Sequence, residues 1–385
     1  MRLIFGLIFC LCAFAMMSCR QSSTTTHVPA TTPSNTAPSL DFSTLDDILN
    51  AEQKLSPQPA YAIGIVYRGH VVYQRFHGKI KGKFDGGPIN DESIFRIGSV
   101  SKGFAGVLAA MLAEKKLINI NDPVSKYIPE LRLKSSVPGD SLRIWHILSH
   151  STGLTEHAFS NLIEMGTPKA KVIAALSTLK ARDITGQDYA YQNAAYSLIE
   201  EVIAKVTGMT YKQALQAFIF QRLGMSHASA DFDSIANNPH FVWPQHAGGA
   251  VRELDTCYYN TPSAGGINAS LADMEKWLIA IMGFKPEHLS HAALKMAFEP
   301  RISTSYDDKY FNFWPGVTDS HYGLGWRILD FGEQRLIFHG GQVSHYRAEI
   351  AFDPQTKLGI VAMFSEPCRL SNVLVPTVFS NVKTL

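Results

Sequence analysis

The period of the apolar residues changes along the chain, and this change constrains the fold more than any other feature of the sequence. Residues 44–55 carry apolar side chains on one helical face, and the run YAIGIVYRGHVVYQRFHG that follows predicts two strands around a turn at residues 68–70. After Tyr322, short β-rich runs separated by polar turns predict an antiparallel meander, which ends in a helical tail from Leu370. Both ends of the folded part are therefore predicted to contribute strands.

Helical patterns lie between these two regions. From Phe104, apolar residues recur at the helical period and predict a helix buried along one stripe, and residues 121–241 hold further helical patterns separated by polar turns. We expect the N-terminal hairpin and the C-terminal meander to form one antiparallel sheet with flanking helices, interrupted by a mainly helical insertion at residues 105–245. The predicted fold is of the mixed α/β (α+β) class, with a cleft where the helices meet the sheet.

The first residues have the layout of an export signal. Met1 and Arg2 precede an uncharged apolar run over residues 3–17, and Ser18 and Cys19 follow it. This stretch resembles a bacterial lipoprotein signal, which implies that Cys19 accepts a lipid. Plain secretion is the next alternative and an uncleaved anchor the last, because the apolar run is short for a membrane span. We expect an exported protein, anchored at the cell envelope and facing the periplasm, or otherwise secreted.

A polar tract separates this signal from the folded part. Residues 20–40 are rich in Ser, Thr and Pro and nearly free of apolar side chains, so they cannot repay the entropy of ordering and are predicted to form a disordered tether. The folded domain is predicted to span residues 41–385. Without the signal, Cys257 and Cys368 remain beside Cys19. Two buried free thiols are favoured there, although an oxidising compartment would permit a disulfide.

The charge balance excludes one class of partner. Lys and Arg total 35 against 33 Asp and Glu, with no basic run, so nothing indicates a nucleic-acid-binding surface. A small molecule or peptide is the expected ligand. His146 and His150 stand four apart but lack the Glu of a zinc-protease helix, because Ile147 occupies its place, and a structural pair is favoured. Residues 224–228, GMSHA, imitate a nucleophile elbow but follow a helical run where a strand is required. We expect no metal and no cofactor.

The start of the helix before Phe104 carries a hydroxyl and an amine one turn apart. Residues three apart share a helical face, so Lys102 can hold its nitrogen against the oxygen of Ser99. Burial and the positive end of the helix both disfavour the ammonium form, which leaves a neutral amine that can activate a serine nucleophile. The alternative is a capping Ser99 with a solvated Lys102, because this four-residue pattern is common by chance.

Two further motifs follow in the sequence. Tyr191-Gln192-Asn193 stands directly before a helical run, and His339-Gly340-Gly341 ends a strand run. Taken alone, Asn193 could be a helix cap and Tyr191 a packed aromatic residue, and the glycines only a turn.

In this order and with their flanking phrases, the motifs resemble the penicillin-recognising serine hydrolases, which include class C β-lactamases, D-Ala-D-Ala carboxypeptidases and esterase relatives. The resemblance runs over residues 45–364. It implies a β-lactamase/transpeptidase-like fold and an acyl-enzyme mechanism. The flanking phrases are NDPVSKYIPEL at 121–131, LSHSTGL at 148–154, SAGGINASLADMEKW at 263–277 and YGLGWRI at 322–328.

The resemblance also implies residue roles. Ser99 is the nucleophile, and Lys102 and Tyr191 handle its proton and that of the leaving group. With no counterpart for the water-activating glutamate of class A enzymes, deacylation also falls to Tyr191. The product is a hydrolysed β-lactam, D-Ala peptide or ester.

Substrate-binding residues follow from the same resemblance. The Asn193 amide contacts the acyl side chain, the backbone N–H groups of Ser99 and Gln342 hold the oxyanion, and His339-Gly340-Gly341 lines the carboxylate side. The family's usual lysine and hydroxyl residue are here His339 and Gly340, so a carboxylate-bearing substrate loses a donor unless Ser344 or Gln342 compensates. This favours an esterase or peptidase. The alternative is a lipid-anchored penicillin-binding or sensor module that acylates without efficient turnover.

Overall fold

The computed structural model describes residues 40–84, 86–131, 133, 142–181, 184–304, 311 and 314–384. The predicted signal, the lipid-accepting Cys19 and the tether up to residue 39 lie outside this part of the chain. The described part begins with β1 (Leu40–Asp41), which pairs with β12 (Lys383–Thr384). Within the described ranges, no helix has both the length and the apolar character needed to cross a bilayer.

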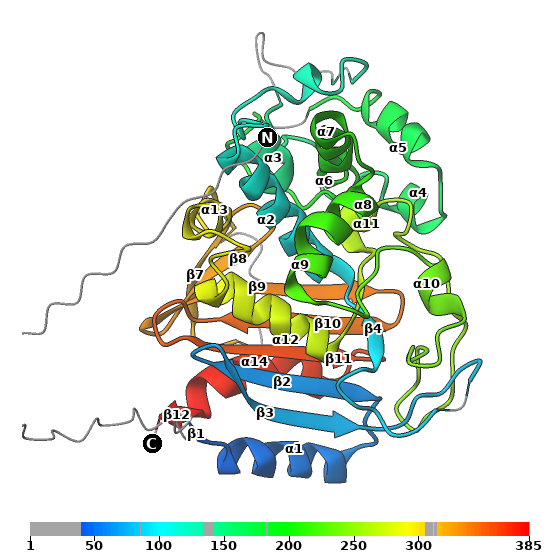
Figure 1. The fold of residues 1–385 in the computed structure, drawn as a ribbon, viewed down its shortest axis with the longest axis vertical. Helices are drawn as coiled ribbons and strands as arrows, with labels where there is room; N and C mark the ends of the chain where they lie inside the picture. Colours follow the sequence, from blue (N-terminus) through cyan, green and yellow to red (C-terminus); the bar gives the residue numbers. More distant parts are fainter. Residues whose placement is uncertain are drawn as a thin grey trace, which may run out of the picture. The chain divides into compact units, whose positions relative to one another are not determined.

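An eight-stranded antiparallel sheet joins the two ends of the chain, as predicted. Its strand order is β3-β2-β11-β10-β9-β8-β7-β6, so the N-terminal hairpin pairs with the last strand of the C-terminal meander through contacts such as Ile63 opposite Ala362 (Figure 1). The strands are β2 (Tyr61–Tyr67), β3 (His70–His77), β6 (Ile302–Ser303), β7 (Val317–Tyr322), β8 (Arg327–Phe331), β9 (Gln334–Val343), β10 (Tyr346–Phe352) and β11 (Leu358–Phe364).

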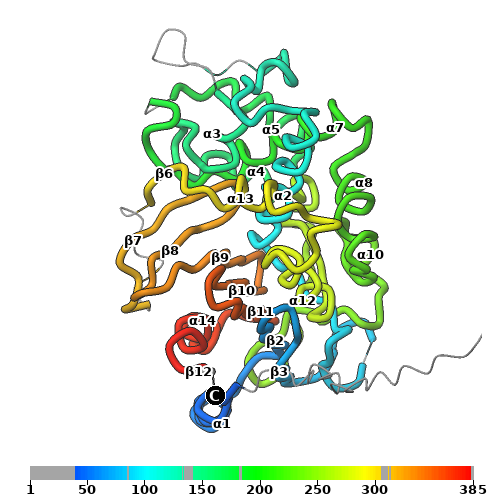
Figure 2. Tube along the Cα trace, turned by 60° about the vertical axis from the view of Figure 1, so that its left-hand side comes forward, coloured from blue at the N-terminus to red at the C-terminus, as the bar shows by residue number. Residues whose placement is uncertain are grey.

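Helices cover both faces of this sheet. All seven residues of β2 are buried because successive side chains point to opposite faces, and each face has a helical cover. Ile63 joins the apolar cluster under α1 (Ser43–Leu55) and α14 (Arg369–Asn381). Ala62 joins the cluster under α2 (Ser101–Glu114) and α12 (Leu271–Ile279), on the other side of the sheet (Figure 2).

The helix α2 is buried on all sides over residues 101–112, not along one stripe as the sequence predicts. The short residues on it allow this. A Cβ on Gly106 would lie 1.7 Å from the backbone oxygen of Leu324, and one on Gly103 would lie 2.4 Å from the ring of Trp326. The connection between β7 and β8 therefore packs directly on the backbone of α2.

The remaining helices gather mostly at one end of the sheet, as Figure 1 shows. The sequence predicts helical patterns up to residue 241, but the last helix of this stretch, α10, ends at Ala236, and residues 237–261, all of them described, hold only turns and isolated bridges. Polar contacts rather than apolar periodicity shape that stretch. These helices are α3 (Ile144–Leu148), α4 (Ser160–Glu164), α5 (Lys169–Leu176), α6 (Asn193–Tyr196), α7 (Leu198–Thr207), α8 (Tyr211–Leu215), α9 (Gln221–Leu223), α10 (Asp233–Ala236), α11 (Pro262–Gly265) and α13 (His291–Ala297).

Candidate active site

Ser99 lies in a tight turn between a strand and a helix. The strand β4 (Ile94–Arg96) pairs with β5 (Asn268–Ser270), a 3₁₀ turn spans Gly98–Val100, and α2 begins at Ser101. The sequence predicts a helix start at residues 99–102, and α2 does begin there, at Ser101. The sequence does not predict the 3₁₀ turn that precedes it. Ser99 is half-buried and belongs to this turn, two residues before the first residue of α2.

Two glycines let the strand β9 cross this turn. Gly98 has φ 52°, and a Cβ there would lie 2.8 Å from the backbone of Gln342. A Cβ on Gly341 would lie 2.1 Å from the backbone oxygen of Ile97 and 2.9 Å from the nitrogen of Ser99. Any larger residue at either position would separate the two segments. The backbone of residues 341–342 is therefore held directly against the turn that carries Ser99.

Lys102 is fully buried and has three oxygen partners. Its Nζ lies 3.1 Å from Ser99 Oγ, 2.7 Å from Asn193 Oδ1 and 2.6 Å from the Ala264 carbonyl oxygen. Burial, and after it the positive charge of Arg327, lowers the pKa of the amine well below its usual value of 10.5.

These contacts define how the neutral amine is oriented. A neutral amine has two hydrogens and one lone pair. The Asn193 oxygen and the Ala264 carbonyl accept hydrogens only, and they make the two shorter contacts. The lone pair is then left to accept the hydrogen of the Ser99 hydroxyl, which is the geometry that a base needs.

The carbonyl of Ala264 is itself held in place by a buried carboxylate. Glu200, on α7, accepts hydrogen bonds from the backbone N–H and the hydroxyl of Ser263, at 2.9 and 2.6 Å. Its second oxygen lies 3.1 Å from the amine of Lys169. Burial raises the pKa of Glu200, and Lys169 opposes this. The one-turn helix α11 is thus anchored next to the residue whose carbonyl meets Lys102.

Asn193 is the first residue of α6 and not its cap. Gln192 is the N-cap, with its side chain accepting from the N–H of Ala194, so the Asn193 side chain is free to point at Lys102. The Asn193 Nδ2 donates to the phenol oxygen of Tyr258 at 3.1 Å. The amide therefore lies between the buried amine and a second phenol.

Tyr191 lies beside the same pair. The Lys102 Nζ is 4.7 Å from the centre of the Tyr191 ring, and a hydrogen bond links the Tyr191 phenol to Ser99. Burial raises the pKa of this phenol well above its usual value of 10.0, and the contact with Ser99 opposes the rise. The phenol is protonated at neutral pH and can donate its hydrogen.

His339 is buried and both of its ring nitrogens have partners. The Gly340 carbonyl can only accept, so Nδ1 donates to it at 2.7 Å and Nε2 accepts from the hydroxyl of Tyr322 at 2.7 Å. Burial, and then the charge of Lys102, lowers the pKa of this imidazole well below 6.5. His339 is a neutral ring whose two nitrogens are both bonded within the protein, so it does not present the cation or donor that the resemblance implies on the carboxylate side.

A pocket of about 680 Å³ opens at Ser99. Lys102 and Gly341 are not part of its lining: Lys102 is fully buried, and Gly341 is a residue of β9 that packs against the Ser99 turn. Predicted site residues make up much of the wall: Ser99, Tyr191, Asn193, His339, Gly340 and Gln342.

The pocket also includes residues that sequence reasoning missed. Arg327 and Arg347, on β8 and β10, bring positive charge to the strand side, and Arg347 pairs with the buried Glu349. Tyr258 and Glu164 form part of the other side, where the Tyr258 hydroxyl hydrogen-bonds the Glu164 carboxylate. Strand register offers a signal for both arginines, because Arg327 pairs with Phe338, the neighbour of His339, and Arg347 pairs with Gln342.

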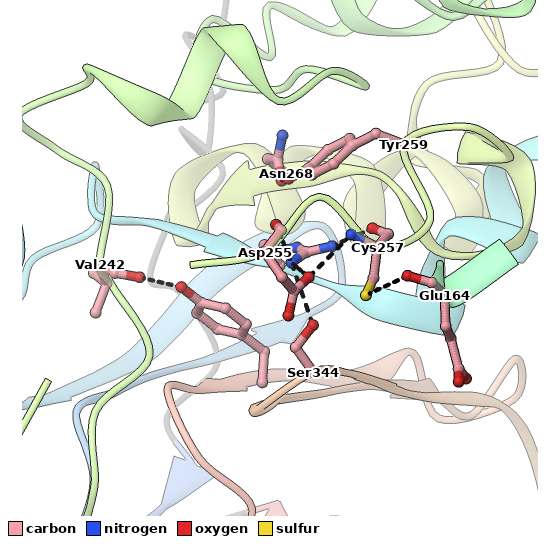
Figure 3. Close-up of polar contacts among 9 residues, drawn as sticks. Glu164, Val242, Asp255, Cys257, Tyr259, Asn268 and Ser344 are labelled. Atoms are coloured by element: carbon pink, nitrogen blue, oxygen red, sulfur yellow. Dashed lines mark hydrogen bonds and ion pairs between the residues drawn. The ribbon is translucent and has the colours of Figure 1, made fainter. Parts of the chain in front are cut away.

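A buried arginine ties three segments together beside the pocket. Arg96, 1% exposed, donates to Asp255 at 3.0 Å, to the carbonyl of Cys257, and to the Ser344 hydroxyl at 3.4 Å. Figure 3 shows Asp255, Cys257 and Ser344 converging there. Ser344 is thus engaged in this cluster and is not part of the pocket wall, so it does not compensate for the hydroxyl missing at Gly340.

The two cysteines of the folded part are free thiols, as predicted, but each is half-buried rather than buried. The Cys257 thiol donates to the backbone oxygen of Glu164 at 3.2 Å, and burial raises its pKa to about 11. Burial also raises the pKa of Cys368. Neither is activated as a nucleophile.

The chain is similar to several known proteins. A family model described as Beta-lactamase matches residues 49–369. A beta-lactamase of Escherichia coli (strain K12) is 24% identical over 71% of this chain and 67% of its own length. Protein flp of Staphylococcus aureus (strain COL) is 22% identical over 88% of this chain and 65% of its own length. The unguisins hydrolase ungD of Aspergillus violaceofuscus is 28% identical, and the chain spans 53% of it.

A solved structure has the same fold. The octameric penicillin-binding protein homologue from Pyrococcus abyssi superposes with a TM-score of 0.73 at 21% identity, covering 88% of this chain and 77% of that one. At this identity the likeness concerns the fold alone.

Proposed function

Because this chain belongs to the beta-lactamase family, we propose that it is a serine hydrolase that forms an acyl-enzyme at Ser99 and releases it with water. One observation carries the proposal: the buried Lys102 amine contacts the Ser99 hydroxyl while its other two contacts are to acceptors. A serine hydroxyl is a weak nucleophile until a base takes its proton, and this amine is oriented to take it.

The proposed reaction has two halves. Ser99 loses its proton to Lys102 and attacks the carbonyl, and the N–H groups of Ser99 and Gln342 stabilise the oxyanion. The protonated phenol of Tyr191 donates to the leaving group and is replenished from Lys102. Water then attacks the acyl-enzyme, with the Tyr191 and Lys102 pair receiving its proton. The raised pKa of Tyr191 suits a donor, which leaves Lys102 as the primary base.

Esters, and peptides without a carboxylate at this position, are the proposed substrates in preference to β-lactams and D-Ala peptides that carry one. Gly340 has no hydroxyl, and the neutral His339 already spends both nitrogens on Tyr322 and Gly340. A hydrogen bond to a charged group contributes about 1.5 to 3 kcal/mol, which a β-lactam carboxylate would lose at this point of the wall. The same loss supports the alternative of a sensor that acylates but turns over poorly.

Two measurements test the proposal: the time course of product release, and mass spectrometry of the acylated protein followed by its proteolytic peptides. We expect an activated ester to give steady turnover, and a β-lactam or a D-Ala-D-Ala peptide to give at most a slowly formed adduct. Any acyl adduct should map to the proteolytic peptide that contains Ser99. A burst of one equivalent of product followed by a stall would favour the sensor. An adduct on another residue, or no hydrolysis of any ester, would contradict the assignment of Ser99.

Localisation is a second part of the proposal. The export signal and Cys19 predict a lipid-anchored protein at the cell envelope, with the pocket on the periplasmic side. We expect cells fed labelled palmitate to incorporate it into the full chain and not into Cys19→Ser. Equal labelling of both proteins, or a wild-type chain found unlabelled in the cytoplasm, would contradict the anchor.

A further inference from the structure

His150 is a buried histidine that the proposed reaction does not use. It is fully buried, directly follows Ser149, the C-cap residue of α3, and has φ 59°. A left-handed conformation is uncommon for a residue with a side chain, and it costs free energy unless the surroundings hold it. The sequence predicts only a structural pair with His146, so the strained backbone requires its own explanation.

The contacts of His150 bracket the residue Tyr191. Its backbone oxygen accepts from the N–H of Ala190 at 2.8 Å, and its Nδ1 accepts from the N–H of Gln192 at 3.1 Å. The imidazole also packs on the Tyr191 ring, with centroids 4.1 Å apart and planes at 35°. One residue thus holds the backbone on each side of Tyr191 and the ring itself.

The left-handed backbone makes this bracket possible, because it turns the carbonyl and the side chain of His150 toward the same segment. The arrangement has a further cost. Because Nδ1 accepts, the hydrogen of the neutral ring is on Nε2, which is buried and has no hydrogen-bond partner among the described residues. Burial, and after it the charge of Lys102, lowers the pKa of the ring well below 6.5, so that Nδ1 stays an acceptor.

We propose that His150 is the positioning residue of Tyr191: it fixes residues 190–192 so that the phenol stays within reach of Ser99 and Lys102. The inference rests on the proposed function. His150 is not part of the pocket wall and acts only through Tyr191. A catalytic group displaced by about 1 Å can lose about 100-fold in rate, so a residue that fixes its position has a measurable effect.

Two esters that differ only in their leaving group can distinguish the positioning of Tyr191 from a general effect of His150 on stability. A p-nitrophenolate departs without a proton, whereas an ethoxide needs one from Tyr191. Esters with the same acyl group and these two leaving groups therefore differ in how much they depend on the phenol. Loss of general stability would lower kcat/KM for both by the same factor.

The test measures kcat/KM for both esters in variants of the full chain. For His150→Phe, which keeps a ring but has no acceptor, we expect a drop of about 30-fold with the ethyl ester and under about 3-fold with the p-nitrophenyl ester. In His150→Asn the Oδ1 can replace Nδ1 as acceptor and Asn tolerates positive φ, so we expect both esters to stay within about 3-fold of wild type.

Two further variants serve as controls. His146 is a matched control, because its Nδ1 also accepts a backbone N–H, that of Arg143 at 3.0 Å, while its ring meets Trp145 edge to face instead. His146→Asn should leave the ratio of the two esters unchanged. In a Tyr191→Phe background, His150→Phe should add no further loss, since the phenol it positions is gone.

Equal losses with both esters, or additive losses in the double variant, would overturn the positioning role. If His150→Phe does not fold, a folded His150→Asn that is as sensitive to the leaving group as Tyr191→Phe would overturn it as well. Failure of the proposed function has a different result, because Ser99→Ala would then keep its activity toward both esters.

Discussion

Ser99→Ala is expected to lower kcat/KM for an activated ester by about 10⁴-fold or more, because among the described residues the hydroxyl hydrogen-bonded to the Lys102 amine is that of Ser99. The fold should persist, since Ser99 is half-buried and the turn depends on backbone contacts with β9. Initial rates on purified protein measure the effect, with thermal unfolding as the check on folding.

A neighbouring serine provides the matched control. Ser101 is fully buried, and its hydroxyl accepts from the N–H of Ile267 at 3.1 Å, away from the pocket wall. Ser101→Ala should lower the unfolding free energy by about 1 to 3 kcal/mol and leave kcat/KM within about 3-fold. Residual activity above one tenth of wild type in Ser99→Ala would refute the nucleophile assignment.

Lys102→Arg has the second largest expected effect, a loss of about 10³-fold in kcat/KM. A guanidinium stays protonated at any pH used for assays and cannot accept the Ser99 proton. It is also too large for a site whose three oxygens lie within 3.1 Å of the amine nitrogen. Lys126→Arg, at an exposed ion pair with Asp122, should change nothing measurable.

The wild-type pH profile gives an independent reading of the same amine. Lys102 accepts a proton only when neutral, so kcat/KM should rise with pH through its pKa and level off above it. Burial lowers that pKa well below 10.5, so the plateau should be reached on the acid side of this value. A rate that keeps rising up to pH 10.5 would show that the amine is not depressed.

The elements that sequence could predict are those set by local spacing. Alternation and turns gave the hairpin and the meander, and the shared sheet followed from the lack of any other partner for their apolar faces. The approach of Lys102 to Ser99 follows from a separation of three residues near a helix start. The spacing rules act over short range, whereas the pairing of the two ends in one sheet is a long-range contact that follows from the layered architecture of domains.

The contacts that could not be predicted depend on where distant segments meet. Asn193 reaches both Lys102 and Tyr258 only because Gln192 takes the capping position. The engagement of His339 by Tyr322 depends on the register of three strands, β7, β8 and β9, so the histidine that replaces the family's lysine is a buried ring with both nitrogens already bonded. The chemistry of a side chain is known from sequence, but its partners are not.

The tight crossing of β9 over the Ser99 turn has a consequence for assembly. The turn belongs to the first third of the chain and the strand to its last part, and Gly98 and Gly341 hold them backbone to backbone. The two N–H groups assigned to the oxyanion therefore share one side of the pocket only once the final strands have docked. A nascent chain that lacks residues 334–364 contains Ser99 and Lys102 but not the Gln342 N–H assigned to the oxyanion. Hydrolysis is therefore expected only after these strands have been added and have docked.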